Sequence, residues 1–128
     1  MREKLLVDTD VLIDYLREQP QAVAYLETLD DPFYVSVISV AELFAGVRDG
    51  DESEQLASFL GACNIVELNA AIAEAGGLYR RDYGKTHGVG LADALIAATA
   101  NSHEMTVVTL NARHYPGLEN LHIPYLKS

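Results

Sequence analysis

The chain has 128 residues, the length of one ordinary domain and enough to bury a hydrophobic core without cross-links. Its formal net charge of −10 excludes a broadly basic nucleic-acid-binding surface, although carboxylates clustered to hold divalent cations would explain part of that charge. The single cysteine, Cys63, excludes an internal disulfide, and no apolar run is long enough to span a membrane. We therefore expect one cytoplasmic domain that covers residues 1–128.

Strand and helix patterns alternate along the first half of the chain. The apolar run that begins at Leu5 predicts a buried strand, which ends at Asp8, where an amphipathic helix begins. Pro20 is suited to open a second helix, and the β-rich residues 33–37 predict a second strand. A helix with an apolar face is predicted directly after it, over residues 38–47.

The alternation continues in the second half. Asp51 or Ser53 is expected to cap a helix. A long helix is predicted over residues 70–84, weakened by Gly76-Gly77. The other predicted elements are strands at 64–68 and 105–110, a helix at 91–100 and an edge strand containing Pro124. Alternating strands and helices predict a three-layer α/β/α sandwich with a central, mainly parallel sheet of four to five strands.

Polar side chains stand at equivalent positions in four of these segments. Asp8 ends the first strand, Glu42 lies early in the helix after the second, and Asp93 lies in the first turn of the 91–100 helix. Asn111 follows the 105–110 strand, just after Thr109. Because carboxyl ends of neighbouring parallel strands meet at one edge of a sheet, these groups are expected to converge. Oxygen ligands of this kind suit Mg²⁺, and a cation would relieve the repulsion between the acids.

Each of these residues also has an ordinary structural explanation. Asp8 is suited to cap the first helix, and Glu42 is suited to face solvent. Asp93 complements a helix dipole, and Asn111 is a common turn residue. Their joint occurrence, in this order and structural context, favours a shared site.

Four segments in series resemble the PIN-domain ribonucleases, and most closely the VapC-type toxins of bacterial toxin–antitoxin pairs. The segments are LLVDTDVLIDYL, VSVISVAELFAGV, GLADALIAATA and VVTLNARHYPGLENL, and together they span nearly the whole chain. The resemblance implies a small α/β/α nuclease that binds Mg²⁺ or Mn²⁺ and cleaves RNA with a metal-activated water. The expected products carry a 5′-phosphate and a 3′-hydroxyl.

The resemblance also implies roles for individual residues. Matching the motifs makes Asp8, Glu42 and Asp93 the catalytic, metal-binding acids. Asn111 occupies a fourth catalytic position, where many PIN proteins carry an aspartate; its neutral amide weakens the case for a tightly held second metal. Asp10 is near enough to help hold water or metal, although capping is its more ordinary role. Thr9 and Thr109 are candidates to hydrogen-bond the acids.

The implied partners are RNA, an antitoxin and a second copy of the chain. VapC-type toxins are neutralised by a cognate VapB-like antitoxin, whose C-terminal segment crosses the acidic pocket and often inserts a basic side chain. They commonly form homodimers. His114 is either a phosphate contact or a packing residue. The candidate RNA-binding residues are Arg80, Arg81, Lys85 and Arg113.

Two other functions fit parts of the sequence. In a haloacid-dehalogenase-type phosphatase, Asp8 would be a covalent nucleophile and Asp10 an acid or base. That chemistry needs a later lysine and acidic pair, but the 18 residues after VVTL hold no acidic pair. The second alternative is a catalytically inactive PIN-like module that binds a basic peptide in its acidic pocket. Metal-dependent cleavage of RNA would separate these alternatives from the nuclease.

Overall fold

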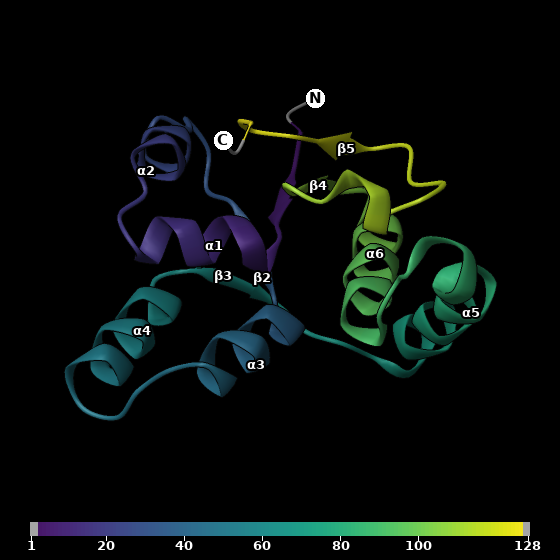
Figure 1. Ribbon diagram of the computed structural model, residues 1–128, viewed down its shortest axis with the longest axis horizontal. Helices are drawn as coiled ribbons and strands as arrows, with labels where there is room; N and C mark the ends of the chain where they lie inside the picture. Colours follow the sequence, from purple (N-terminus) through teal and green to yellow (C-terminus); the bar gives the residue numbers. More distant parts are fainter. Residues whose placement is uncertain (1–2, 127–128) are drawn as a thin grey trace.

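Short β-branched and apolar runs form a five-stranded parallel sheet in the computed structural model, which describes residues 3–126 (Figure 1). The strand order is β3-β2-β1-β4-β5, with β1 at the centre. The two-residue β5 lies at an edge, as the nearby Pro124 predicts. The strands are β1 (Leu5–Val7), β2 (Tyr34–Ser36), β3 (Asn64–Val66), β4 (Thr106–Val108) and β5 (Leu121–His122).

Six α-helices and one 3₁₀ turn connect the strands. The prediction that Asp51 or Ser53 caps α4 is wrong. Helix α4 begins at Asp51, and its N-cap is Gly50, which has no side chain to offer. Gly50 has φ of 91°, a backbone conformation that glycine adopts without strain, so the chain turns one residue earlier than expected. The elements are α1 (Thr9–Leu16), α2 (Pro20–Glu27), α3 (Val37–Ala45), α4 (Asp51–Gly61), α5 (Ala70–His87), α6 (Leu91–His103) and η1 (Ala112–His114).

Alternate side chains of the strands pack against two different helical layers. Val7 and Val108 contact a cluster built from α1, α2, α3 and α4. Leu6 and Val107, one residue earlier in each strand, contact a cluster that includes α6 and Tyr79 of α5. The predicted three-layer α/β/α sandwich with a parallel sheet is therefore confirmed, and its two helical layers lie on either side of the strands in Figure 1. Within residues 3–126, no helix is long and apolar enough to cross a membrane.

The direction in which the chain adds strands reverses at β1. From β1 the chain proceeds to β2 on one side, whereas β4 pairs on the other side. Ligands of open α/β sheets bind at such a reversal, outside the carboxyl ends of the strands. The Asp8 backbone N–H donates to Val108 O at 2.8 Å, so the pairing continues one residue past β1. Asp8 is thereby fixed next to Thr109 at this end of the sheet.

Helix α5 is continuous through Gly76-Gly77, so the expected weakening at this pair does not interrupt the helix. Gly76 is buried at the contact with α6. A Cβ atom at Gly76 would lie 2.6 Å from Leu95 Cδ2 and 3.2 Å from Leu95 Cα. A Cβ atom at Gly77 would meet nothing within 4 Å. The first glycine therefore permits close packing of α5 on α6, and the second has no such role.

This difference predicts opposite effects of one substitution at adjacent positions. Gly76→Ala should lower the free energy of unfolding by about 1–3 kcal/mol, because the added methyl group overpacks the contact with Leu95. Gly77→Ala should raise it by about 0.5–1 kcal/mol, because alanine loses less backbone entropy in a helix. Urea unfolding followed by circular dichroism measures both changes. Equal effects of the two substitutions would contradict this account of the packing.

Candidate metal and active site

Asp8 is a buried carboxylate, with only 5% of its surface exposed, at the junction of β1 and α1. It is the N-cap of α1, and its Oδ1 accepts from the Thr9 backbone N–H at 2.8 Å. Its Oδ2 accepts from the hydroxyls of Thr109 at 2.8 Å and Tyr115 at 2.9 Å. Three donors therefore stabilise a negative charge at this end of the sheet, and Asp8 caps α1 as one of the two explanations predicted.

Glu42 lies on the exposed side of α3 and is joined to α1 by one hydroxyl group. Thr9 donates its hydroxyl hydrogen to Glu42 Oε1 at 2.7 Å. Thr9 Oγ1 also lies 2.8 Å from Oγ of Ser39, which is fully buried. Because Thr9 directly follows Asp8, a single residue links the carboxylates that β1 and α3 supply. The predicted hydrogen bonds from Thr9 and Thr109 to the acids are confirmed.

Asp93 lies in the first turn of α6, on the opposite side of the sheet from Glu42's helix. Its Oδ2 is 3.2 Å from His114 Nδ1, and both side chains are 27% exposed. Burial raises the pKa of Asp93, and so do the negative charges of Asp8 and Glu42, whereas His114 lowers it. The three acids are therefore close enough for their charges to repel.

Asp10 connects α1 to the segment after β4. Its Oδ1 accepts from the Val11 backbone N–H at 2.7 Å, and its Oδ2 accepts from the Leu110 N–H at 3.0 Å. Burial and the neighbouring charge of Asp8 raise the pKa of Asp10 to about 6, although these hydrogen bonds oppose the rise. Asp10 thus accepts hydrogen bonds from backbone groups of α1 and of the segment after β4. This favours the expected capping role, and it also ties α1 to that segment.

Asn111 follows β4 as predicted and is exposed. Its backbone N–H donates to Thr109 Oγ1 at 3.0 Å. In the described part of the chain, its side-chain amide has no hydrogen-bond partner, so nothing orients it toward the three acids. Asn111 is therefore joined to Asp8 through its backbone N–H and Thr109, and not through its side chain.

The contacts of His114 and Tyr115 with the acids were not anticipated. His114 contacts Asp93, although a phosphate contact or packing was expected for it. Tyr115 is 2% exposed, and burial, followed by the charges of Asp8 and Asp93, raises the pKa of its hydroxyl. The only available sequence signal was their position, three and four residues after Asn111, because the direction of each side chain depends on the turn η1.

Comparison with known proteins identifies the family. The PIN domain profile matches residues 5–116. The chain belongs to the PIN-domain family. The PIN resemblance drawn from four sequence segments is therefore confirmed, and it favours a nuclease over a phosphatase.

Three relatives extend the match over nearly the whole chain. Ribonuclease VapC10 of Mycobacterium tuberculosis is 37% identical over 124 residues, which cover 94% of this chain and 92% of VapC10. Toxin FitB of Neisseria gonorrhoeae is 38% identical over 122 residues, which cover 82% of this chain and 86% of FitB. A chain of a toxin–antitoxin complex from Klebsiella pneumoniae superimposes with a TM-score of 0.83 at 27% identity, covering 97% of this chain and 100% of that one.

The acids of this PIN domain fit a hard divalent cation in their chemistry. Mg²⁺ and Mn²⁺ bind carboxylate oxygens and water, and the site offers Asp8, Glu42 and Asp93. Within residues 3–126, however, no three acidic, histidine or cysteine side chains are grouped as a ready-made metal site. Hydrogen bonds to Thr9, Thr109, Tyr115 and His114 hold the acids instead. Glu42, the most exposed of the three acids, would therefore have to move toward a cation held by the other two.

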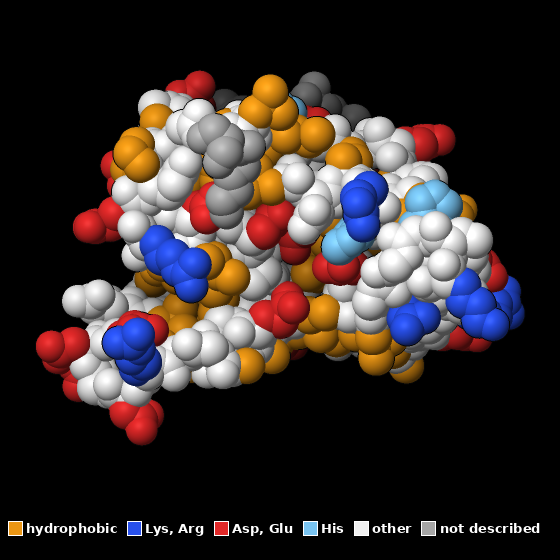
Figure 2. All heavy atoms as spheres, in the orientation of Figure 1, with side chains coloured by type: hydrophobic (Ala, Val, Ile, Leu, Met, Phe, Trp, Pro, Cys, Tyr) orange, Lys and Arg blue, Asp and Glu red, His pale blue; other side chains and the backbone are white. Residues whose placement is uncertain are grey.

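Figure 2 shows how charge is distributed on one face of this PIN domain. Acidic side chains gather in the middle of the face, and Lys and Arg side chains lie on both sides of them. The acidic centre repels a phosphate backbone, whereas the flanking basic residues attract it. A bound cation would reduce this repulsion at the centre.

The network around Thr109 yields a prediction about stability. Thr109 is fully buried, donates to Asp8, lies 3.3 Å from Asp10 Oδ2 and accepts from Asn111. Thr109→Val keeps the shape but removes these bonds, and should lower the free energy of unfolding by about 2–4 kcal/mol.

Thr106→Val is the matched control for this change. Thr106 is a buried threonine at the start of β4, the strand that Thr109 follows, but its hydroxyl donates to Glu3, which is exposed. Thr106→Val should lower the free energy of unfolding by at most about 1 kcal/mol. Chemical denaturation in the presence of EDTA measures both values, and equal losses would contradict a special role for Thr109.

Proposed function

We propose that this PIN-domain protein is a metal-dependent ribonuclease toxin that hydrolyses RNA phosphodiester bonds and is neutralised by a cognate VapB-like antitoxin. The observation that carries the proposal is the grouping of three acids at the carboxyl end of the parallel sheet. Thr9 links Glu42 to the residue beside Asp8, and the turn η1 and the residue after it contact Asp93 and Asp8. The relatives named ribonuclease VapC10 and toxin FitB support the same reaction class and biological role. The expected products carry a 5′-phosphate and a 3′-hydroxyl.

Asp8, Glu42 and Asp93 are the residues that would hold Mg²⁺ or Mn²⁺. A bound divalent cation supplies charge neutralisation at the scissile phosphate and lowers the pKa of water. Asp8, fixed by three hydrogen-bond donors, anchors the arrangement. The more exposed Glu42 is suited to accept the proton of the attacking water, and Asn111 offers an amide to orient water or phosphate.

RNA binding is expected to involve the basic residues of α5 and η1. Arg113 lies in η1, directly before His114, and is exposed. Arg81 pairs with Asp82 at 2.9 Å, and both side chains are exposed, so this pair neutralises part of its charge. We therefore expect Arg113 to contribute more to RNA binding than Arg81, while Arg80 and Lys85 extend the basic surface along α5.

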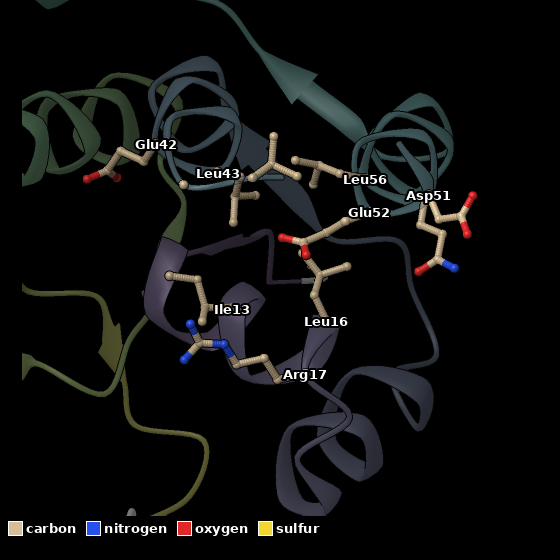
Figure 3. A pocket seen from close by; sticks show the side chains of 11 residues that line it. Ile13, Leu16, Arg17, Glu42, Leu43, Asp51, Glu52 and Leu56 are labelled. Carbon is tan, nitrogen blue, oxygen red and sulfur yellow. The ribbon is translucent and has the colours of Figure 1, made fainter. Parts of the chain in front are cut away.

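A groove beside the acids is suited to receive the antitoxin. It encloses about 510 Å³ between α1, α3 and α4, next to Glu42 (Figure 3). Figure 3 shows Ile13 and Leu16 of α1 opposite Leu56 of α4, with the carboxylate of Glu52 between the two helices. The groove has apolar walls and three acidic side chains against one basic one, Arg17, which fits a segment that carries apolar and basic side chains. Such a segment would reach Glu42 from the groove.

We also propose a homodimer that acts in the cytoplasm. Large apolar side chains remain exposed on α3, α5 and the start of α6: Phe44 at 40%, Leu78 at 45% and Leu91 at 57%. A second copy that covered them would remove apolar surface from water. The single cysteine, which forms no disulfide, suits a reducing compartment.

The metal requirement predicts the effect of removing single charges. Glu42→Gln and Asp93→Asn should each reduce cleavage of structured RNA by more than ~100-fold in Mg²⁺, because each removes a charged ligand. Asp82→Asn is the control, since Asp82 is exposed and pairs only with Arg81 in the described residues. Gel analysis of the products, with EDTA as a further control, measures cleavage. Metal-independent cutting, or full activity of folded Asp93→Asn protein, would contradict the proposed mechanism.

The position of the groove predicts that a substitution in it can weaken antitoxin binding without affecting catalysis. Leu16→Asp should weaken binding of the cognate antitoxin at least ~10-fold, because an apolar contact becomes charged. Its RNA cleavage should remain. Ile123→Asp is the control, since Ile123 is also exposed, at 44%, but does not line the groove. If the Leu16→Asp variant binds the antitoxin with unchanged affinity, the antitoxin does not bind in this groove.

A further inference from the structure

The turn after β4 brings two consecutive side chains onto two different acids of the site. His114 Nδ1 lies 3.2 Å from Asp93 Oδ2, and Tyr115 donates its hydroxyl hydrogen to Asp8 Oδ2 at 2.9 Å. We propose that His114 and Tyr115 are positioning residues that hold Asp93 and Asp8 in fixed orientations before a divalent cation binds. This inference rests on the proposed metal-dependent function and deepens it.

Hydrogen bonding around Asp8 leaves little choice of orientation. A carboxylate has about four lone-pair sites, two on each oxygen. Tyr115 and Thr109 together occupy both sites of Oδ2, and the Thr9 N–H occupies one site of Oδ1. About one site therefore remains, on Oδ1, for a cation or a water molecule. Rotation of the carboxylate away from this arrangement would break charge-assisted hydrogen bonds.

Tyr115 supplies its hydroxyl group from a rigid position. Its ring belongs to the hydrophobic cluster that contains Leu6, Ile96 and Val107, and the residue is 2% exposed. Close packing of this kind restricts a side chain to one conformation. The hydroxyl is therefore a fixed donor to Asp8, unlike a water molecule, which would leave the carboxylate freer to move.

Further hydrogen bonds fix the backbone around His114 and Tyr115. The His114 N–H donates to Asn111 O at 3.0 Å, and the Asn111 N–H donates to Thr109 Oγ1 at 3.0 Å. On the other side, Tyr79 of α5 donates its hydroxyl hydrogen to Pro116 O at 2.6 Å. His114 is thus held on both sides and contacts one oxygen of Asp93. Within residues 3–126, the other oxygen of Asp93 has no hydrogen-bond partner, so it remains available to a cation.

Tyr115→Phe tests the proposal because it removes the hydroxyl group and keeps the ring. Its matched control is Tyr125→Phe, since Tyr125 also donates to a buried aspartate of α1, Asp14, at 2.9 Å. Mn²⁺ affinity of the whole chain is measured by electron paramagnetic resonance of free Mn²⁺. Tyr115→Phe should weaken Mn²⁺ binding ~10–100-fold, the range for residues that orient metal ligands. Tyr125→Phe should change it less than ~2-fold.

A pair of histidine variants tests the second contact. His114→Ala should weaken Mn²⁺ binding, whereas His114→Asn should largely restore it, because the asparagine amide can replace the Nδ1–H donor. Unchanged or tighter Mn²⁺ binding by Tyr115→Phe would overturn the proposal, even if that variant is less stable. Equal weakening by Tyr125→Phe would also overturn it. Wild-type protein that binds no Mn²⁺ and leaves RNA intact would instead contradict the proposed function itself.

Discussion

The candidate site depends on the parallel pairing of β1 with β4. Leu5, Leu6 and Val7 pair with Thr106, Val107 and Val108, and the Asp8 N–H continues the ladder to Val108 O. A shift of one residue in this register would turn the side chains after each strand to the opposite face of the sheet. Asp8 and Thr109 meet at hydrogen-bonding distance only in the observed register. Cores on both faces of the sheet stabilise that register, because alternate residues of both strands are buried in different clusters.

Neutral donors, rather than basic side chains, hold most of the acids at the site. Hydroxyl groups of threonine and tyrosine and backbone N–H groups bind Asp8, Asp10 and Glu42. Among these acids and Asp93, only Asp93 contacts a residue between 3 and 126 that can carry positive charge. Hydrogen bonds of this kind stabilise ionised carboxylates without cancelling their charge. The negative potential therefore remains, and burial together with this potential raises the pKa of Asp10 and Asp93. A divalent cation is the partner that relieves this repulsion most directly.

Helix α1 connects the acids to the groove. Its N-cap is Asp8, and its later residues Ile13, Leu16 and Arg17 line the groove, which also includes Glu42 of α3. A partner that fills the groove therefore contacts one of the proposed metal ligands, Glu42, without needing to contact the sheet. This arrangement explains physically how an antitoxin segment with a basic side chain would block the site: the cation and that side chain compete for the same carboxylate.

The sequence alone determined the order of strands and helices, the parallel sheet and the family, because periodic apolar patterns and four ordered motifs carry that information locally. It also indicated that Thr9 and Thr109 would bind the acids. The local pattern misjudged Gly76, whose role is contact with Leu95, a residue of another helix. It equally missed the hydrogen bond between Tyr115 and Asp8, which are 107 positions apart in the chain. Tertiary structure alone decided these contacts, because they depend on the packing of helices and on the path of one turn. Neither the packing of two helices nor the path of a turn leaves a periodic signal in the sequence.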